Sequence, residues 1–270
     1  MRKALSLITF STLFILLVAF AAPAFGGEPS GLASQFSLSG GPTASPVVGL
    51  TSSVQSASEN SGYFLSGAIL DDFLLLYSDW TLTPVETMLT MTGGLVLLEF
   101  DKPIYDFILK YEPEIVDQYI SPFLSKLGEG PVLLGIAGAL AFVDPELSKE
   151  ILLALLVDTV NTQVLKCLIG MSRPYVADEP MFIGPTFNDD YKAMPSGHTS
   201  STFAVATILA LRYPKYGWLF YSAASLISVS RITEEQHWPS NVFFGAMVGV
   251  ASARQVHEHR LDLVVLRLQF

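Results

Sequence analysis

The sequence predicts an all-α protein: a helical bundle of about six core helices, preceded by an N-terminal signal segment and a flexible linker. Half of the 270 residues are hydrophobic and only 15% are charged, which is more apolar than an ordinary cytosolic domain. The apolar residues also fall into long segments that begin with helix start signals, whereas the alternating pattern of strands is sparse.

The N-terminal 26 residues are typical of a secretory signal peptide. Arg2 and Lys3 precede an apolar run that ends in small residues. An uncleaved anchor helix is the alternative, because the run is nearly long enough to span a membrane. Residues 27–62 are rich in Ser, Gly and Pro and predict a flexible linker. We therefore expect an exported protein of the periplasm or cell envelope, with a helical domain over residues 63–260 and a tail over 261–270.

The helical domain is expected to open with an amphipathic surface helix over residues 63–80. Seven further apolar segments then predict helices: Pro84–Phe100, Ile104–Leu127 (interrupted at Pro113 and Pro122), Pro131–Val143, Lys149–Ile169, Thr199–Arg212, Tyr216–Ser230 and Ser240–Val256. Asp144 precedes the fourth of these segments, and Ser240 is a candidate N-cap of the last.

Composition and charge narrow the classes of function. The formal net charge of −10 excludes the basic footprint of a nucleic-acid-binding protein. A single cysteine, Cys167, excludes an intramolecular disulfide and a multi-cysteine zinc site. Most helical segments are short for a membrane span, and polar residues such as Asp158 interrupt the longest. We expect a domain that associates with a membrane surface, and integral insertion is the alternative.

Three short stretches carry the chemistry. They are Lys166-x6-Arg173-Pro174 at the end of one helix, Pro195-Ser196-Gly197-His198 at the start of the next, and Ser230-Arg231-x5-His237 at a third helix end. Arginine and lysine bind phosphate oxygens, and backbone N–H groups at a helix start bind anions. One imidazole can attack phosphorus while a second protonates the leaving oxygen. The stretches therefore favour phosphoryl transfer.

In this order, the three stretches resemble the signature K-x6-RP, PSGH and SR-x5-H-x3-D of the phosphatidic acid phosphatase type 2 / vanadium haloperoxidase superfamily. The resemblance implies a helical bundle that needs no cofactor or metal, with vanadate as a phosphate mimic. It also implies that His198 is the general acid and His237 the nucleophile that becomes phosphohistidine. The implied phosphate ligands are Lys166, Arg173, Ser196, Gly197 and Arg231.

One position departs from the signature. Asn241 stands where the family has an aspartate that accepts a hydrogen bond from the nucleophilic histidine. An amide lacks the charge that stabilises a protonated imidazole, so we expect Asn241 to reduce activity, or Glu234 or Glu235 to substitute for the missing carboxylate. A third possibility is a degenerate domain that binds phosphate or a lipid head group without turnover.

The expected function is a metal-independent phosphatase that hydrolyses phosphate monoesters or pyrophosphates through a phosphohistidine. The apolar composition and the amphipathic segment at residues 63–80 favour a lipid-linked substrate, although phosphorylated small molecules remain candidates. The alternatives are a nonspecific soluble periplasmic acid phosphatase, a vanadate-dependent haloperoxidase and the degenerate binding protein. No nucleic-acid partner is expected.

Overall fold

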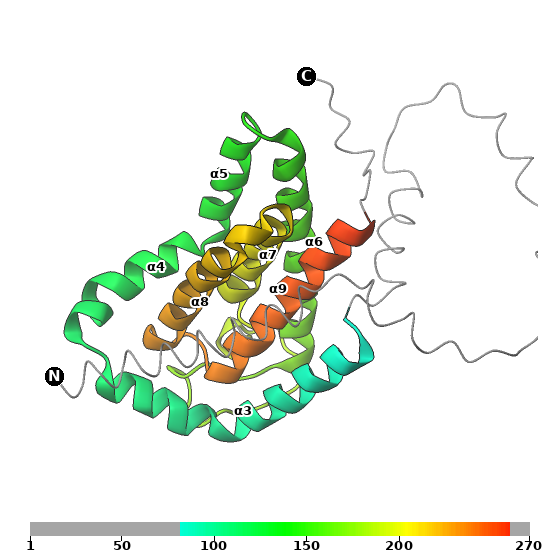
Figure 1. The fold of residues 1–270 in the computed structure, drawn as a ribbon. Coiled ribbons are helices and arrows are strands. Elements are labelled where there is room, and N and C mark those ends of the chain that lie inside the picture. Colours follow the sequence, from blue (N-terminus) through cyan, green and yellow to red (C-terminus); the bar gives the residue numbers. More distant parts are fainter. Residues whose placement is uncertain (1–81, 260–270) are drawn as a thin grey trace, which may run out of the picture.

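The computed structural model of the protein describes residues 82–259 (Figure 1). The predicted signal segment, the linker, the amphipathic helix over residues 63–80 and the tail lie outside the described residues. The domain boundaries therefore stay predictions.

The described residues confirm the all-α prediction. Two three-residue 3-10 helices, at Asp189–Tyr191 and Pro214–Tyr216, and a π-helical turn at Val116–Ile120 accompany the α-helices. Strand pairing within this part of the chain is confined to isolated bridges at Met171. The α-helices are α3 (Pro84–Tyr111), α4 (Ser121–Leu127), α5 (Gly130–Leu140), α6 (Pro145–Ile169), α7 (Gly197–Arg212), α8 (Gly217–Thr233) and α9 (Pro239–His259).

Helix α7 lies at the centre of the bundle and packs against α6, α8 and α9. Two glycines of α9 permit the close approach to α7: a Cβ on Gly245 would lie 2.6 Å from the Ser196 carbonyl oxygen, and one on Gly249 would lie 2.1 Å from that of Ser200. Any larger side chain would force the helices apart. These contacts fix the first turn of α7 against α9.

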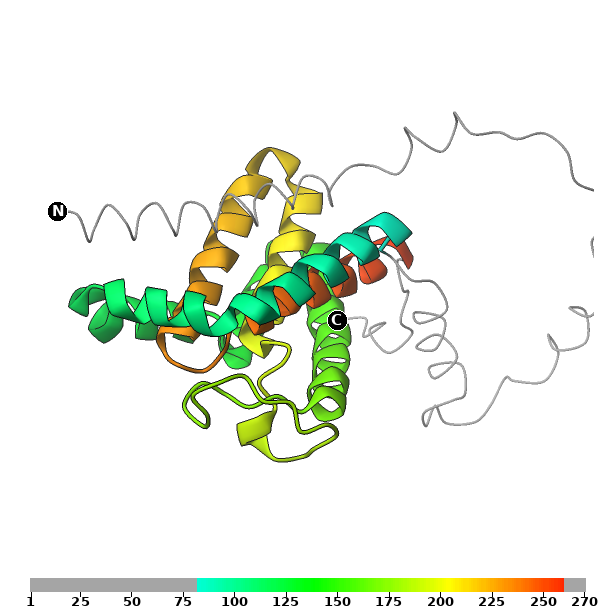
Figure 2. The same ribbon diagram turned by 90° about the horizontal axis from the view of Figure 1, so that it is seen from below.

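Helix α3 crosses the bundle alongside α9 (Figure 2). The sequence predicted a gap between Phe100 and Ile104, but α3 continues through Pro103. An interior proline costs a helical hydrogen bond. Contacts next to it hold the helix in place, because the buried carboxylate of Asp101 accepts hydrogen bonds from the Ser240 N–H (2.7 Å) and hydroxyl (2.6 Å).

The other boundaries follow local signals. The predicted break at Pro113 is confirmed, since α3 ends at Tyr111. Pro122 interrupts nothing because it lies in the first turn of α4, where a proline leaves no extra unpaired N–H group. Asp144 is the N-cap of α6, and its carboxylate accepts from the Leu147 N–H at 3.1 Å. Ser240 was predicted to cap α9, but it lies inside that helix and bonds to Asp101 instead.

Among the described residues, α6 is long and apolar enough to cross a membrane, and 44% of its most apolar window is buried inside the protein. The bent pair Val116–Leu127 and Gly130–Leu140, which meet at 52°, would be a second candidate. A core helix of a soluble protein meets the same criteria, so surface association of an exported domain stays a prediction.

Candidate active site

The three sequence stretches meet at one end of the bundle. The C-terminal ends of α6 and α8 and the N-terminal ends of α7 and α9 lie there, because consecutive helices of the bundle reverse direction (Figure 1). Loops or terminal helical turns at this end supply every residue of the three motifs that was assigned a role: Lys166, Arg173, Ser196, Gly197, His198, Arg231 and His237.

Lys166 lies in the last turn of α6 and is buried. Its Nζ donates to the Lys192 carbonyl oxygen at 2.7 Å. A Cβ added to Gly197 would lie 3.7 Å from Lys166 Cε, so the ammonium group is adjacent to the start of α7. Burial, and then the positive charge of Arg173, lowers the pKa of Lys166 to about 7. The site is therefore short of negative charge.

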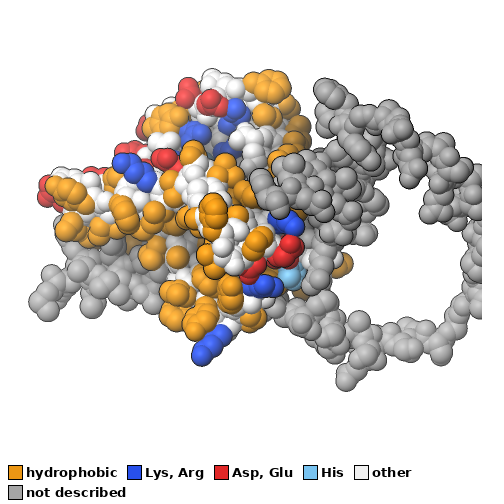
Figure 3. Space-filling model, turned by 90° about the horizontal axis from the view of Figure 1, so that it is seen from above, with side chains coloured by type: hydrophobic (Ala, Val, Ile, Leu, Met, Phe, Trp, Pro, Cys, Tyr) orange, Lys and Arg blue, Asp and Glu red, His pale blue; other side chains and the backbone are white. Residues whose placement is uncertain are grey.

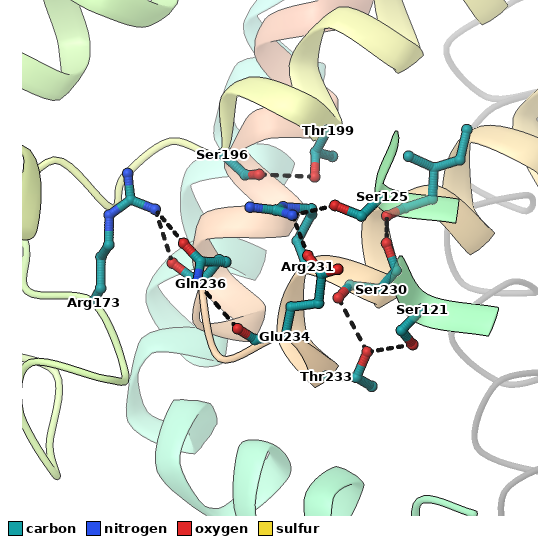
Figure 4. Close-up of polar contacts among 11 residues, drawn as sticks. Ser121, Ser125, Arg173, Ser196, Thr199, Ser230, Arg231, Thr233, Glu234 and Gln236 are labelled. Carbon is teal, nitrogen blue, oxygen red and sulfur yellow. Dashed lines mark hydrogen bonds and ion pairs between the residues drawn. The ribbon is translucent and has the colours of Figure 1, made fainter. Parts of the chain in front are cut away.

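The two arginines are held by different neighbours (Figure 4). Arg173 Nε donates to the Asp189 carbonyl oxygen at 3.1 Å, and its Nη1 donates to Gln236 Oε1 at 3.2 Å. Arg231, which is buried, donates through Nη1 to the Ser125 hydroxyl and to the Glu234 carboxylate.

Arg231 has unused capacity to bind an anion. Its buried Nε finds no hydrogen-bond partner within the described part of the chain. Burial lowers the pKa of Arg231, while the Glu234 carboxylate opposes that shift. A buried N–H group without an acceptor costs free energy, and an oxyanion in the site would supply the acceptor.

Ser196 is the N-cap of α7, and its buried hydroxyl accepts from Thr199 Oγ1 at 3.1 Å. Its N–H donates to the Asn241 carbonyl oxygen at 2.9 Å, so this N–H is already used. Gly197 is the first residue of the helix, where N–H groups have no acceptor inside the helix. The start of α7 thus faces Lys166 with free donors and the positive end of a helix dipole.

His198 follows in the first turn of α7. A Cβ added to Gly128 would lie 3.4 Å from His198 Cδ2, which places the ring beside the bend between α4 and α5. Burial lowers the pKa of His198 to about 4, and Arg231, Lys166 and Arg173 contribute further. The imidazole is thus neutral at pH 7 when no anion offsets these cations.

His237 lies in the loop between α8 and α9 and is 2% exposed. Its Nδ1 is 2.8 Å from the Ala193 carbonyl oxygen. A carbonyl oxygen only accepts, so Nδ1 must carry the proton and Nε2 the lone pair. Burial, and then the charge of Lys166, holds the pKa of His237 well below its usual value. The neutral ring presents a nucleophilic nitrogen.

A cavity of about 550 Å³ opens next to these groups. His198, Arg231 and Glu234 contribute to its lining from α7 and the end of α8. The rest of the lining, the α4–α5 wall, comes from α4, the start of α5 and the bend between them: Pro122, Ser125, Lys126, Glu129, Gly130 and Pro131. His237 does not line it.

Residues 149–261 match the model of the PAP2 superfamily. The match confirms the resemblance that the three stretches predict. The chain is 45% identical over 60 residues to the lipid A 1-phosphatase of Porphyromonas gingivalis, covering 21% of this chain and 14% of that protein. It is 28% identical over 130 residues to the undecaprenyl-diphosphatase of Sulfolobus acidocaldarius, covering 47% and 63%. Both alignments span less than two thirds of the relative.

The fold is also similar to that of a protein of known structure. Aquifex aeolicus LpxE superposes with a TM-score of 0.51 at 23% sequence identity, covering 59% of this chain and 95% of that one. The likeness supports the helical architecture alone.

The Asn241 prediction requires a correction. At this position of the PAP2 signature we expected a side chain facing His237, but Asn241 Oδ1 accepts from the Trp238 N–H at 3.0 Å and closes the first turn of α9. Its Nδ2 donates to Met171 Sδ at 3.0 Å. The side chain folds back on its own helix start because the Trp238 N–H has no acceptor within the helix.

Neither proposed substitute carboxylate contacts His237. Glu234 pairs with Arg231, and Glu235 accepts from the Tyr105 hydroxyl at 2.8 Å. The acceptor at His237 Nδ1 is instead the backbone of Ala193, which lies in the loop before α7. A sequence motif could not reveal this acceptor, because every residue carries the same backbone carbonyl whatever its side chain.

Ser125 is a second group that sequence reasoning missed. It lies on α4, outside the three motifs, and its hydroxyl accepts from Arg231. Within residues 82–259, no group of three His, Cys, Asp or Glu side chains is arranged to hold a metal ion. The basic side chains and neutral hydrogen-bond donors of the site are suited to an anionic ligand.

Proposed function

We propose that this protein is a metal-independent phosphatase that cleaves a phosphate monoester or diphosphate through a phosphohistidine at His237. One observation carries the proposal: three cationic side chains and two neutral imidazoles surround the first turn of α7, and a backbone carbonyl fixes the tautomer of one imidazole. Lys166, Arg173 and Arg231 supply the charge that a phosphoryl transition state needs on its equatorial oxygens.

The chemistry proceeds in two balanced steps. His237 Nε2 forms a bond to phosphorus as the bond to the leaving oxygen breaks, and that oxygen takes a proton from His198. A water molecule then attacks the phosphohistidine, returns a proton to His198 and releases inorganic phosphate. Both histidines end as they began.

The low pKa of His198 fits this cycle once the substrate charge is counted. In the unliganded site burial, and then the charges of Arg231, Lys166 and Arg173, lowers the pKa of His198 to about 4. A bound phosphate dianion offsets Arg231, Lys166 and Arg173, so the pKa of His198 rises when the substrate arrives. This shift favours the protonated form of the general acid in the complex, where its proton is needed.

We infer a lipid-linked substrate and an exported enzyme that acts at a membrane surface. Large apolar side chains are exposed on the described surface, among them Leu89 and Phe100 of α3 and Trp218 of α8. Hydrophobic side chains are spread widely over the face in Figure 3. Exposed apolar surface of this extent is typical of contact with a membrane or partner, and the N-terminal sequence supports export.

Trapping tests the proposed intermediate. Purified protein is incubated with a radiolabelled phosphate monoester or diphosphate, quenched in base, and digested to map the acid-labile phosphate. Label is expected on His237 in the parent protein and absent in His237→Ala, while His257→Ala on the surface of α9 keeps it. Label on another residue, or absence of turnover with any phosphate ester, overturns the proposal.

A soluble acid phosphatase is the second candidate, because the cavity beside His198 is lined mainly by polar residues. Comparing kcat/KM for a short-chain and a long-chain lipid phosphate in vesicles separates the two. A preference for the long chain supports the lipid enzyme, and equal values support the soluble one.

A further inference from the structure

The two imidazoles determine on which side of the phosphate the leaving group lies. In an in-line displacement the nucleophile and the leaving oxygen lie on opposite sides of phosphorus. His237 is buried away from the cavity, whereas His198 lines it. The leaving oxygen must be next to the general acid, so the leaving group occupies the cavity at the bend between α4 and α5.

The α4–α5 wall lies outside the region of the chain that matches the PAP2 model. Its residues span 122–131, whereas the PAP2 match begins at residue 149. His198 and Arg231 of the lining belong to the motifs, whereas the α4–α5 wall comes from sequence outside them. Selection among leaving groups is expected on this wall.

Glu129 is the carboxylate of the α4–α5 wall and can accept a hydrogen bond from a leaving group. Its carboxylate forms no ion pair or side-chain hydrogen bond within residues 82–259, unlike Glu234, which pairs with Arg231. It is nonetheless close enough to the site for its charge to act on Arg231. Glu129 also precedes α5 without a side-chain capping bond, so its replacement leaves the helix start intact.

We propose that the cavity at the α4–α5 bend is the leaving-group subsite and that Glu129 selects leaving groups with a hydroxyl or amine donor close to the ester oxygen. The proposal rests on the phosphatase function above. A carboxylate strengthens a hydrogen bond from such a donor and repels a second phosphate. Lys126 lines the same cavity, and its positive charge would attract a second phosphate. A dominant Lys126 therefore predicts a preference for diphosphates, whereas a dominant Glu129 predicts a preference for leaving groups with a donor.

The test compares three substrates that differ only in the leaving group: glycerol 1-phosphate, n-propyl phosphate and n-propyl diphosphate. The parent protein is expected to favour glycerol 1-phosphate over propyl phosphate by about fivefold to tenfold in kcat/KM. Glu129→Ala is expected to bring that ratio to about one, and Glu129→Gln, which keeps an acceptor, to an intermediate value. Glu99→Ala, an exposed acid on α3, is the matched control and keeps the parent ratio.

The outcomes separate this proposal from the function it rests on. An unchanged ratio in Glu129→Ala, or a parent preference for the diphosphate, overturns the selection by Glu129 and leaves the phosphatase in place. Absence of hydrolysis of all three substrates by the parent protein overturns both.

Discussion

His237 Nδ1 and the Ala193 carbonyl oxygen lie 2.8 Å apart. A backbone carbonyl thus accepts the hydrogen bond that the aspartate of the family signature is expected to accept from this histidine. A backbone carbonyl carries only a partial charge, so it fixes the tautomer and the ring orientation but stabilises a protonated imidazole less than an aspartate does. The hydrogen bond at His237 Nδ1 therefore does not use the side chain at position 241.

The first prediction concerns Asn241. Asn241→Asp is expected to leave kcat within about twofold of the parent value, because the side chain bonds to Trp238 and not to His237. Asn241→Ala is expected to lower the free energy of unfolding by about 1 kcal/mol through loss of the helix-start hydrogen bond. Steady-state kinetics and urea unfolding measure the two effects. A tenfold rise in kcat for Asn241→Asp would show that residue 241 reaches His237.

The second prediction concerns the carboxylate paired with Arg231. Glu234 pairs with the guanidinium of Arg231, for which we propose phosphate binding, and its negative charge repels a dianion. Glu234→Gln is expected to lower KM by about threefold with a smaller change in kcat. Glu235→Gln is the matched control, since Glu235 bonds to Tyr105 instead. A rise in KM for Glu234→Gln would mean that the ion pair orients Arg231 for binding.

The third prediction concerns the buried cation of α6. Lys166→Met is expected to leave the unliganded protein as stable as the parent or more so at pH 7, because it removes a buried ammonium with only a carbonyl partner. The same change should abolish stabilisation by orthovanadate, which in the parent reaches about 2.7 kcal/mol at a concentration of 100 times Kd.

Thermal unfolding with and without orthovanadate measures both effects. Lys149→Met, in the first turns of the same helix, is the matched control, because Lys149 pairs with Glu146 away from the site. Retained stabilisation by vanadate in Lys166→Met would remove Lys166 from the phosphate site.

The fourth prediction concerns pH. The pKa of His198 is about 4 in the folded protein against 6.5 for the ordinary side chain. The unfolded chain therefore binds a proton more readily, so this group's contribution to stability is complete above pH 6.5 and is lost as the pH falls toward 4. The contribution is about 3 kcal/mol at 1.36 kcal/mol per pKa unit.

Urea unfolding of His198→Gln between pH 7 and pH 4 checks this sign. The variant is expected to lose less stability than the parent over that range, whereas His257→Gln follows the parent. Identical slopes for His198→Gln and the parent would mean that His198 titrates normally in the folded state.

Local sequence signals sufficed for most of the helices. Asp144 caps α6 and Pro113 follows the end of α3, because capping and proline geometry depend only on neighbouring residues. The gap predicted around Pro103 was wrong because the contacts that hold α3 there are not local. The bonds from Ser240 to Asp101 hold α3 there, and they join residues far apart in the sequence.

By itself the sequence determined the helical architecture and the three motifs for which we propose phosphate binding, since both depend on side-chain types at short spacing. Only the tertiary structure decided which group contacts His237 Nδ1, where Asn241 bonds and which residues line the cavity beside His198. The physical reason is that a backbone carbonyl has no sequence signature. The Ser125 and Glu129 side chains likewise acquire their neighbours only when the bend between α4 and α5 meets α7 and α8.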